Sequence, residues 1–210
     1  MTTATILLAT LPASVLLAEL AGYAIHRLLH SENLPFLSRP HMWHHLKDYA
    51  PGQNQRSARY RDSAAQRFAL FGLGTEWLLP LLVVSLAWSG LGLLLGLYLW
   101  VNLLSVLIGQ IWGALMFGFM HARFHLSETW FVRHPLVRTW FLRIRRLHDI
   151  HHHRLTDDGR MAFNLGICFF WFDRLFGSYR MATGPRNQRG LQRSREIFAE
   201  MQGSLGPKTT

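Results

Sequence analysis

Histidine is the residue type in this chain with the most evident capacity for chemistry. In two places a pair of histidines spaced i, i+4 is followed along the chain by a His-x-x-His-His triplet. Because residues four apart lie on one face of a helix, each pair can direct two imidazoles toward one metal ion. The four clusters hold ten of the 12 histidines, more than the roughly four ligands of one tetrahedral site, which predicts two first-row metal ions in one pocket. The clustered residues are His26 and His30 (HRLLH), His41, His44 and His45 (HMWHH), His121 and His125 (HARFH), and His148, His151 and His152 (HDIHH).

Charge segregation indicates which elements must position these clusters. The chain is 50% hydrophobic and only 16% charged, yet its formal net charge is +10. All 22 Lys and Arg residues lie within 27–67 or 123–208, and the apolar stretches outside these two basic blocks contain none. This distribution follows the positive-inside rule, so both basic blocks are expected on the cytoplasmic face of a membrane.

Three membrane crossings are predicted, over residues 4–25, 68–88 and 91–120. Each stretch is long enough, at ~1.5 Å per residue, to cross a hydrocarbon core of ~30 Å. Ser89-Gly90 is expected to form the turn between the second and third crossings. The third stretch is longer than one span needs, so its HARFH end should tilt or project into the cytoplasm. Two crossings within 91–120 would separate the histidine clusters onto opposite faces, where they could not meet.

The predicted fold class is an all-α integral membrane protein with about three transmembrane helices and a cytoplasmic helical cap. One membrane-embedded domain is expected over 1–180, and its cap, formed by 26–67 and 121–180, holds the histidine-rich two-metal site. A basic tail follows at 181–210, where the spacing of four apolar residues predicts a surface helix or a partly disordered end. Arg outnumbers Lys twenty to two, as is typical of GC-rich bacterial genes, which favours a bacterial inner membrane.

Several other interpretations fit the sequence less well. A cleaved signal peptide is disfavoured because no basic residue precedes the first apolar run and Glu19 interrupts that run. The single cysteine, Cys168, excludes a disulfide and a cysteine-based metal site. A haem site or a metal transporter would place its histidines or other ligands within the membrane, and nucleic acid binding is not expected beside three spans. His134 and His153, outside the clusters, are expected to be structural or surface residues.

The order of the four clusters resembles that of the fatty acid hydroxylase/sterol desaturase superfamily of integral-membrane, histidine-rich di-iron oxygenases. The stretch NLGICFFWFDRLFGSY, Asn164–Tyr179, is similar to the block that closes the family's catalytic region, although Phe172 between Trp171 and Asp173 departs from the family pattern. The resemblance covers most of the chain, from about Glu19 to Tyr179. It implies that the ten clustered histidines are the ligands of two iron ions and that O2 is the co-substrate. Because imidazole suits several metals, zinc can also occupy the site in a purified sample.

The resemblance also implies an activity, the O2-dependent hydroxylation of a membrane lipid or lipid-like substrate by a monooxygenase. Two alternatives stay open, which are desaturation at the same site and a non-enzymatic membrane protein that binds or handles metal. Electrons are expected from a separate protein of the ferredoxin or cytochrome b5 type, because the chain carries no fused redox domain. Candidates for orienting the ligand rings are Asn164, from the closing block, and three carboxylates near the clusters, Glu32, Glu128 and Asp149.

Overall fold

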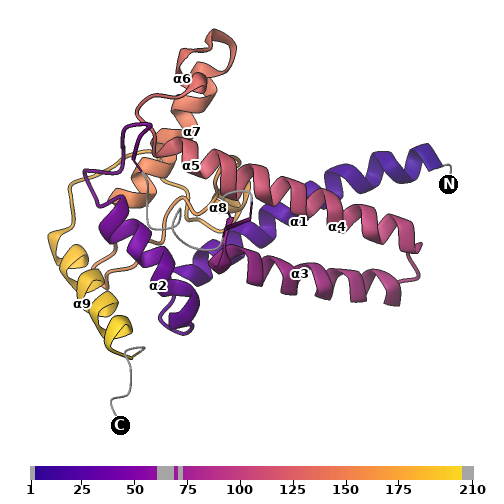
Figure 1. Cartoon of the computed structure of the whole chain (residues 1–210), viewed down its shortest axis with the longest axis horizontal. Helices are drawn as coiled ribbons and strands as arrows, with labels where there is room; N and C mark the ends of the chain where they lie inside the picture. The colour runs from indigo at the N-terminus through magenta and orange to yellow at the C-terminus, as the bar shows by residue number, and fades with distance from the viewer. Residues whose placement is uncertain (1–2, 61–68, 71–72, 205–210) are drawn as a thin grey trace.

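The structure is a computed structural model that describes residues 3–60, 69–70 and 73–204. Three long apolar helices run from a helical cap toward the N-terminus and a turn at the far end (Figure 1). The candidate membrane spans are Thr5–Leu29, Glu76–Leu94 and Leu99–Phe124. They are contributed by α1 (Thr3–Leu29), α3 (Thr75–Leu94), and α4 (Leu99–Gly113) with its continuations η3 (Ala114–Met120) and α5 (His121–Phe124).

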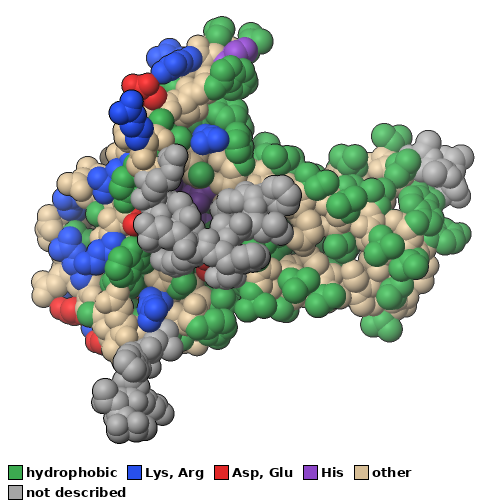
Figure 2. All heavy atoms as spheres, viewed as in Figure 1, with side chains coloured by type: hydrophobic (Ala, Val, Ile, Leu, Met, Phe, Trp, Pro, Cys, Tyr) green, Lys and Arg blue, Asp and Glu red, His purple; other side chains and the backbone are tan. Residues whose placement is uncertain are grey.

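These helices present large apolar side chains to the outside. Leu8 is 77% exposed and Leu94 is 86% exposed. Figure 2 shows hydrophobic side chains along the length of the spans, whereas Lys and Arg gather on the cap. Outward-facing leucines of this kind are stable in the hydrocarbon core of a bilayer, where the helices also satisfy their own backbone groups. The predicted fold class, all-α with three membrane-spanning helices and a cap that holds the histidines, is therefore confirmed.

Buried polar and small residues join the helices in the interior of the bundle. Glu19, which is 2% exposed, accepts a hydrogen bond of 2.7 Å from the indole Nε1 of Trp112, so α1 and α4 are joined by a buried polar contact. Gly22 lies directly beneath the Phe117 ring, which a Cβ at this position would approach to 1.7 Å. Close approach of helices through small residues is the usual way in which membrane helices pack.

The turn between the second and third spans differs from its prediction. α3 continues through Ser89 and Gly90 to Leu94, and the chain reverses at residues 95–98, where Gly96 has φ +72°. In apolar surroundings a helix keeps its internal hydrogen bonds, so Ser and Gly alone do not end it. The positive φ at Gly96 supplies the reversal, because glycine adopts this conformation without steric cost.

The second span also begins later than predicted. The predicted start of this span, Phe68, lies within residues 61–68, which are outside the described part of the chain. The residues just before α3 form a short antiparallel ladder, β1 (Ala69–Leu70) with β2 (Leu73–Gly74), and the helix begins at Thr75. The apolar character of 69–74 was the basis of the prediction, but periodicity alone does not separate short apolar strands from helix.

The cap is helical and packs around the ends of the spans. One buried core connects it to them and includes Leu29 of α1, Phe124 of α5 and Phe141 of α7. Figure 1 shows α6 and the start of α7 projecting away from the rest of the cap. The cap helices are α2 (Pro35–Trp43), η1 (His44–Asp48), α6 (Trp130–Arg133), α7 (Pro135–His153), α8 (Trp171–Leu175) and α9 (Gln188–Ser204).

The C-terminal tail is part of this cap over the length of α9. The four apolar residues that predicted a surface helix face inward and form a second core with Met42, Leu46, Leu155 and Met161. The Phe198 ring contacts the Trp43 ring with a centroid distance of 6.0 Å. The boundary predicted at residue 180 therefore does not separate a tail from the domain, because α9 covers the α2 segment that carries histidines. The inward-facing residues are Leu191, Ile197, Phe198 and Met201.

Candidate metal centre

All ten clustered histidines meet at the cap end of the three spans. His26 lies in the last turn of α1 and His30 directly follows this helix, while His121 begins α5 and His125 directly follows it. The triplets come from the α2–η1 segment and from the last two turns of α7. Eight of the ten rings are at most 9% exposed, so the centre lies in the interior of the protein.

The imidazole nitrogens form two groups, and within each group the ligand atoms lie within 4.8 Å of one another. The groups are adjacent, since the stacked rings of His45 and His152, one from each group, have centroids 3.9 Å apart. Two ions held by these groups would share one pocket, as predicted from the number of donors. Group A is His26, His30, His41, His45 and His151, and group B is His44, His121, His125 and His152.

Each i, i+4 pair stays within one group, whereas each triplet is divided between the groups. In HMWHH, His41 and His45 belong to group A and His44 belongs to group B. His44 begins the π-helical segment η1, where Tyr49 N donates to His44 O over 2.9 Å. A second π-helical segment, η3, ends immediately before His121. Wide turns of this type are frequent at functional sites, because they rotate the side chains that follow.

The spacing of the donors fits a metal ion. The Nε2 atoms of His30 and His151 lie 3.1 Å apart, those of His30 and His41 lie 3.2 Å apart, and those of His41 and His45 lie 3.1 Å apart. Nitrogens ~2.1 Å from one ion are separated by ~3.0–3.4 Å. Buried nitrogens without a hydrogen-bond partner are costly unless a ligand uses them. Such atoms include Nε2 of His26, His44, His121 and His152.

His148 lies beside group B. Its ring is fully buried, and its Nε2 is 3.1 Å from Nε2 of His125. The ring centroid of His148 is also 4.7 Å from that of His152. The structure thus brings all ten predicted residues together, five in group A and five in or against group B.

Backbone carbonyls fix the tautomers of several rings. Nδ1 of His26 donates to Leu165 O over 2.5 Å, and Nδ1 of His151 donates to Phe163 O over 2.8 Å. A carbonyl can only accept, so the proton is on Nδ1 and the Nε2 lone pair is free for a metal. Group B has the same arrangement, in which His125 donates to Asn54 O (2.9 Å) and His152 donates to Tyr49 O (3.1 Å).

Burial also keeps these rings uncharged. Desolvation lowers the pKa of His41, His45 and His152 well below the usual value, and neighbouring histidines lower it further. Desolvation lowers the pKa of His125 to about 3 and that of His151 to about 4, although a backbone carbonyl acts in the opposite direction at each ring. A pKa below 7 means that these imidazoles are neutral at pH 7, which is the form that binds metal.

A protein-family model described as fatty acid hydroxylase matches residues 11–178, which include all ten histidines and both groups. The chain belongs to the fatty acid hydroxylase family. No curated protein and no solved structure matches the chain. Membership places this fatty acid hydroxylase among lipid-oxidising enzymes of the hydroxylase or desaturase type, which use a histidine-rich metal site.

Asn164 of this fatty acid hydroxylase aims two of the carbonyls at group A. It stands between Phe163 and Leu165, whose carbonyls accept from His151 and His26, and its φ of +52° turns the chain so that both point at the centre. The Asn164 side chain donates to Leu147 O and Arg180 O and accepts from Arg180 N, each within 3.0 Å. Asn164 therefore acts on the rings through the backbone, as a positioning residue.

Asp173 holds the same loop through hydrogen bonds to its backbone, and this role was not predicted from the sequence. Its carboxylate accepts from the backbone N–H groups of Leu165 and Gly166 over 2.7 Å and from Ser178 Oγ over 2.6 Å. Asp173 is fully buried, so this carboxylate is committed to the loop. The only sequence signal for a role of Asp173 was its place in the family-like block Asn164–Tyr179, next to Phe172.

The carboxylates predicted to orient the rings are placed differently. Glu128, with its side chain 72% exposed, forms an ion pair of 2.8 Å with Arg133, and Glu32 is exposed at the rim of a cavity. Among the described residues, no histidine ring donates to either. Asp149 accepts from the side chains of Asn54 and Gln55, and burial raises its pKa to about 6. It therefore reaches group B only through Asn54.

The two histidines expected to be structural or surface residues lie apart from both groups. The His134 ring contacts the Trp130 ring with a centroid distance of 4.4 Å, on the projecting part of the cap. His153 is partly exposed after the last ligand of α7. Neither belongs to a group of residues that could hold a metal.

Proposed function

We propose that this fatty acid hydroxylase is an O2-dependent di-iron monooxygenase that inserts oxygen into a C–H bond of a membrane lipid. The observation that carries the proposal is the pair of adjacent, all-histidine groups at the cap end of the three spans. The description of the matching family supports hydroxylation over desaturation. Both reactions begin with removal of one hydrogen atom, and no contact within the centre favours the second.

The donor set supports iron. Neutral imidazole is a ligand of borderline character that suits divalent iron, and zinc could replace it in a purified sample. Group A would hold one ion, and group B with His148 would hold the other. When bound, two ferrous ions supply the capacity to activate O2 and to remove hydrogen from an unactivated C–H bond.

The protein contributes position, protection from water and access to lipid. The carbonyls of Leu165, Phe163 and Asn54 hold ligand rings in a single tautomer, which is how outer contacts tune a metal centre. Burial of eight of the ten rings limits the access of water to the centre. Because the centre lies at the ends of the spans, a lipid chain could reach it from the bilayer by lying along one of the helices.

The charge distribution supports the remaining parts of the proposal. Lys and Arg are confined to the segments of the cap and to span ends next to it, which by the positive-inside rule favours a cytoplasmic location, in bacteria at the inner membrane. A basic surface of this kind suits docking of an acidic electron carrier of the ferredoxin or cytochrome b5 type.

The test compares lipid extracts of cells that express the full chain, the His152→Ala variant or the His153→Ala variant. Mass spectrometry should reveal a lipid with one added oxygen for the full chain and for His153→Ala, but not for His152→Ala. These neighbours form a matched pair, because His152 is buried in group B and His153 is outside both groups. A lipid lacking two hydrogens would indicate desaturation, and unchanged lipids with two ions bound per chain would indicate a metal-handling protein.

A further inference from the structure

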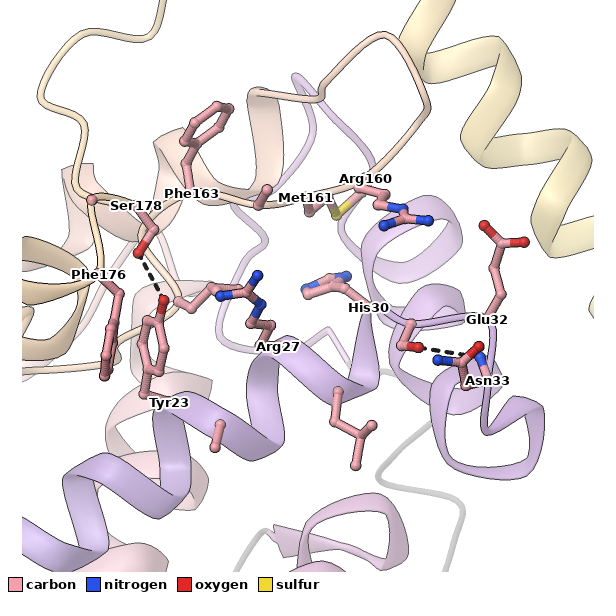
Figure 3. Close-up of a pocket in the computed structure, with 16 residues that line it drawn as sticks. Tyr23, Arg27, His30, Glu32, Asn33, Arg160, Met161, Phe163, Phe176 and Ser178 are labelled. Carbon is pink, nitrogen blue, oxygen red and sulfur yellow. Dashed lines mark hydrogen bonds between the residues drawn. The ribbon is translucent and has the colours of Figure 1, made fainter.

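A cavity of about 630 Å³ lies against group A (Figure 3). One wall is formed by Tyr23 and Arg27 of α1 and by His30, which directly follows this helix. The opposite wall is formed by residues 160–163, Leu165 and residues 176–178. His30 is also a member of group A, so the wall of the cavity is part of the metal centre. Because α1 is a candidate membrane span that ends at Leu29, the cavity beside its end would lie at the level of the lipid headgroups.

The cavity has unused positive charge. Figure 3 shows the Arg27 guanidinium in the middle of the cavity, between Tyr23 and the His30 ring. Arg27 has no ion pair or hydrogen bond with any described residue. Arg160, on the opposite wall, forms an ion pair of 3.2 Å with Asp158, in which both side chains are more than half exposed. The one acidic residue of the lining, Glu32, lies at the end away from Tyr23 and Phe176.

An apolar groove of about 550 Å³ lies beside the cavity. Its lining comes from α1, α2 and α3 together with Leu34, and the described residues that line it include no charged or polar side chain. Ala24 and Leu28 of α1 line both the cavity and the groove, so the two spaces meet across this helix. On the α3 side, Leu79 is 49% exposed and Val83 is 58% exposed, which leaves the groove open to the bilayer.

We propose that the cavity binds the anionic headgroup of an amphiphile, a carboxylate or a phosphate, whose hydrocarbon chain lies across Ala24 in the apolar groove. This deepens the proposed function and rests on it, because the amphiphile is the substrate whose polar end is held beside His30. Arginine at the headgroup level forms paired, charge-assisted hydrogen bonds with either anion. Arg27 is exposed, so water solvates it in the absence of an anion, and a neutral lipid such as a sterol or a carotenoid would gain no charge-assisted hydrogen bond from it.

The test measures binding, not turnover, in the zinc-loaded full chain embedded in phosphatidylcholine nanodiscs. The probes are a 16-carbon fatty acid, the alkyl phosphate of the same length and the corresponding alcohol. Both anions should bind about tenfold more tightly than the alcohol, as expected for a charge-assisted hydrogen bond. Inorganic phosphate alone should not displace them, because it has no chain to fill the groove. Equal binding of acid and alcohol would overturn the proposal.

Three variants locate the binding site. Arg27→Gln should abolish the preference for anions, Arg160→Gln should reduce it by a smaller factor because Arg160 is shared with Asp158, and Arg143→Gln, an exposed arginine of α7, should leave it unchanged. Ala24→Leu should weaken acid and alcohol alike, because Ala24 is exposed and the larger side chain narrows the path of the chain.

Metal content checks that each variant is folded, since Arg27 lies beside a group A ligand. An anion preference that survives in folded Arg27→Gln would contradict the proposal. If the acid binds through Arg27 while the lipid analysis reveals no oxidised product, the anion site stands and the proposed function fails. The two hypotheses are therefore tested separately.

Discussion

The two histidine groups differ in what surrounds them. Group A is held by the loop around Asn164, with carbonyls on His26 and His151, and adjoins the cavity through His30. Group B is held by carbonyls of residues 49 and 54, and its ligands are absent from the lining of that cavity. If the cavity binds the substrate as proposed, group A would face the substrate and group B would complete the proposed two-ion centre from the interior.

Removing a ligand from either group should have the largest effect. His151→Ala in group A and His125→Ala in group B each leave four or fewer donors in their group, and we expect product formation to fall by more than about 100-fold. Iron per chain, measured by mass spectrometry, should fall from two toward one in each variant. If one of the two variants kept full activity and two ions, the division of the histidines into two groups would be wrong.

The loop that holds group A should give the next largest effect. Asn164→Ala removes the three side-chain hydrogen bonds and places a residue with a Cβ at φ +52°, whereas Asn164→Gly removes only the hydrogen bonds. We expect metal affinity to fall by about 10- to 100-fold in Asn164→Ala, as for other outer contacts of metal ligands, and by less in Asn164→Gly.

Double variants show whether this loss is confined to group A. Adding His151→Ala to Asn164→Ala should cause little further loss of iron, because both changes act on one group. Adding His125→Ala should remove the remaining ion. Equal further loss in both double variants would mean that the loop supports the whole centre and that the comparison between the groups is not useful.

Removing the carboxylate that supports group B through Asn54 should give the smallest effect. Asp149 acts on His125 only through the Asn54 side chain, so Asp149→Ala should lower metal affinity by less than about tenfold. Chelator-dependent loss of iron measures the effect, and Glu128→Ala is the matched control, because Glu128 is an exposed carboxylate paired with Arg133. A larger loss of iron in Asp149→Ala than in Asn164→Ala would contradict the expectation that the Asn164 loop contributes more to metal affinity than Asp149 does.

The sequence predicted the parts of the fold and the site that follow from periodicity and charge. The i, i+4 spacing predicted that each histidine pair lies at the end of a membrane helix. The segregation of Lys and Arg predicted that these helix ends lie on one side of the membrane. The division of each triplet could not be predicted, because it depends on η1 and on how α7 is rotated against α1. The turn at Gly96 was also beyond reach, since Ser89-Gly90 carries the same local signal.

The contacts that orient the rings were the least predictable. A carboxylate near a cluster can be seen in the sequence, but every residue has a carbonyl, and only the folded loop selects those of Leu165, Phe163 and Asn54. Glu32 and Glu128 were therefore chosen for their proximity in sequence, and solvent competes more effectively for such exposed side chains.

The central claim is that the ten histidines hold two ions side by side. The most direct measurement is the iron content and Mössbauer spectrum of the purified full chain, loaded with ⁵⁷Fe²⁺ without oxygen and freed of loosely bound metal. We expect two iron ions per chain that react together with O2, because the two groups that would hold them are adjacent. A saturating content of one ion per chain, or two ions that oxidise independently, would contradict the account.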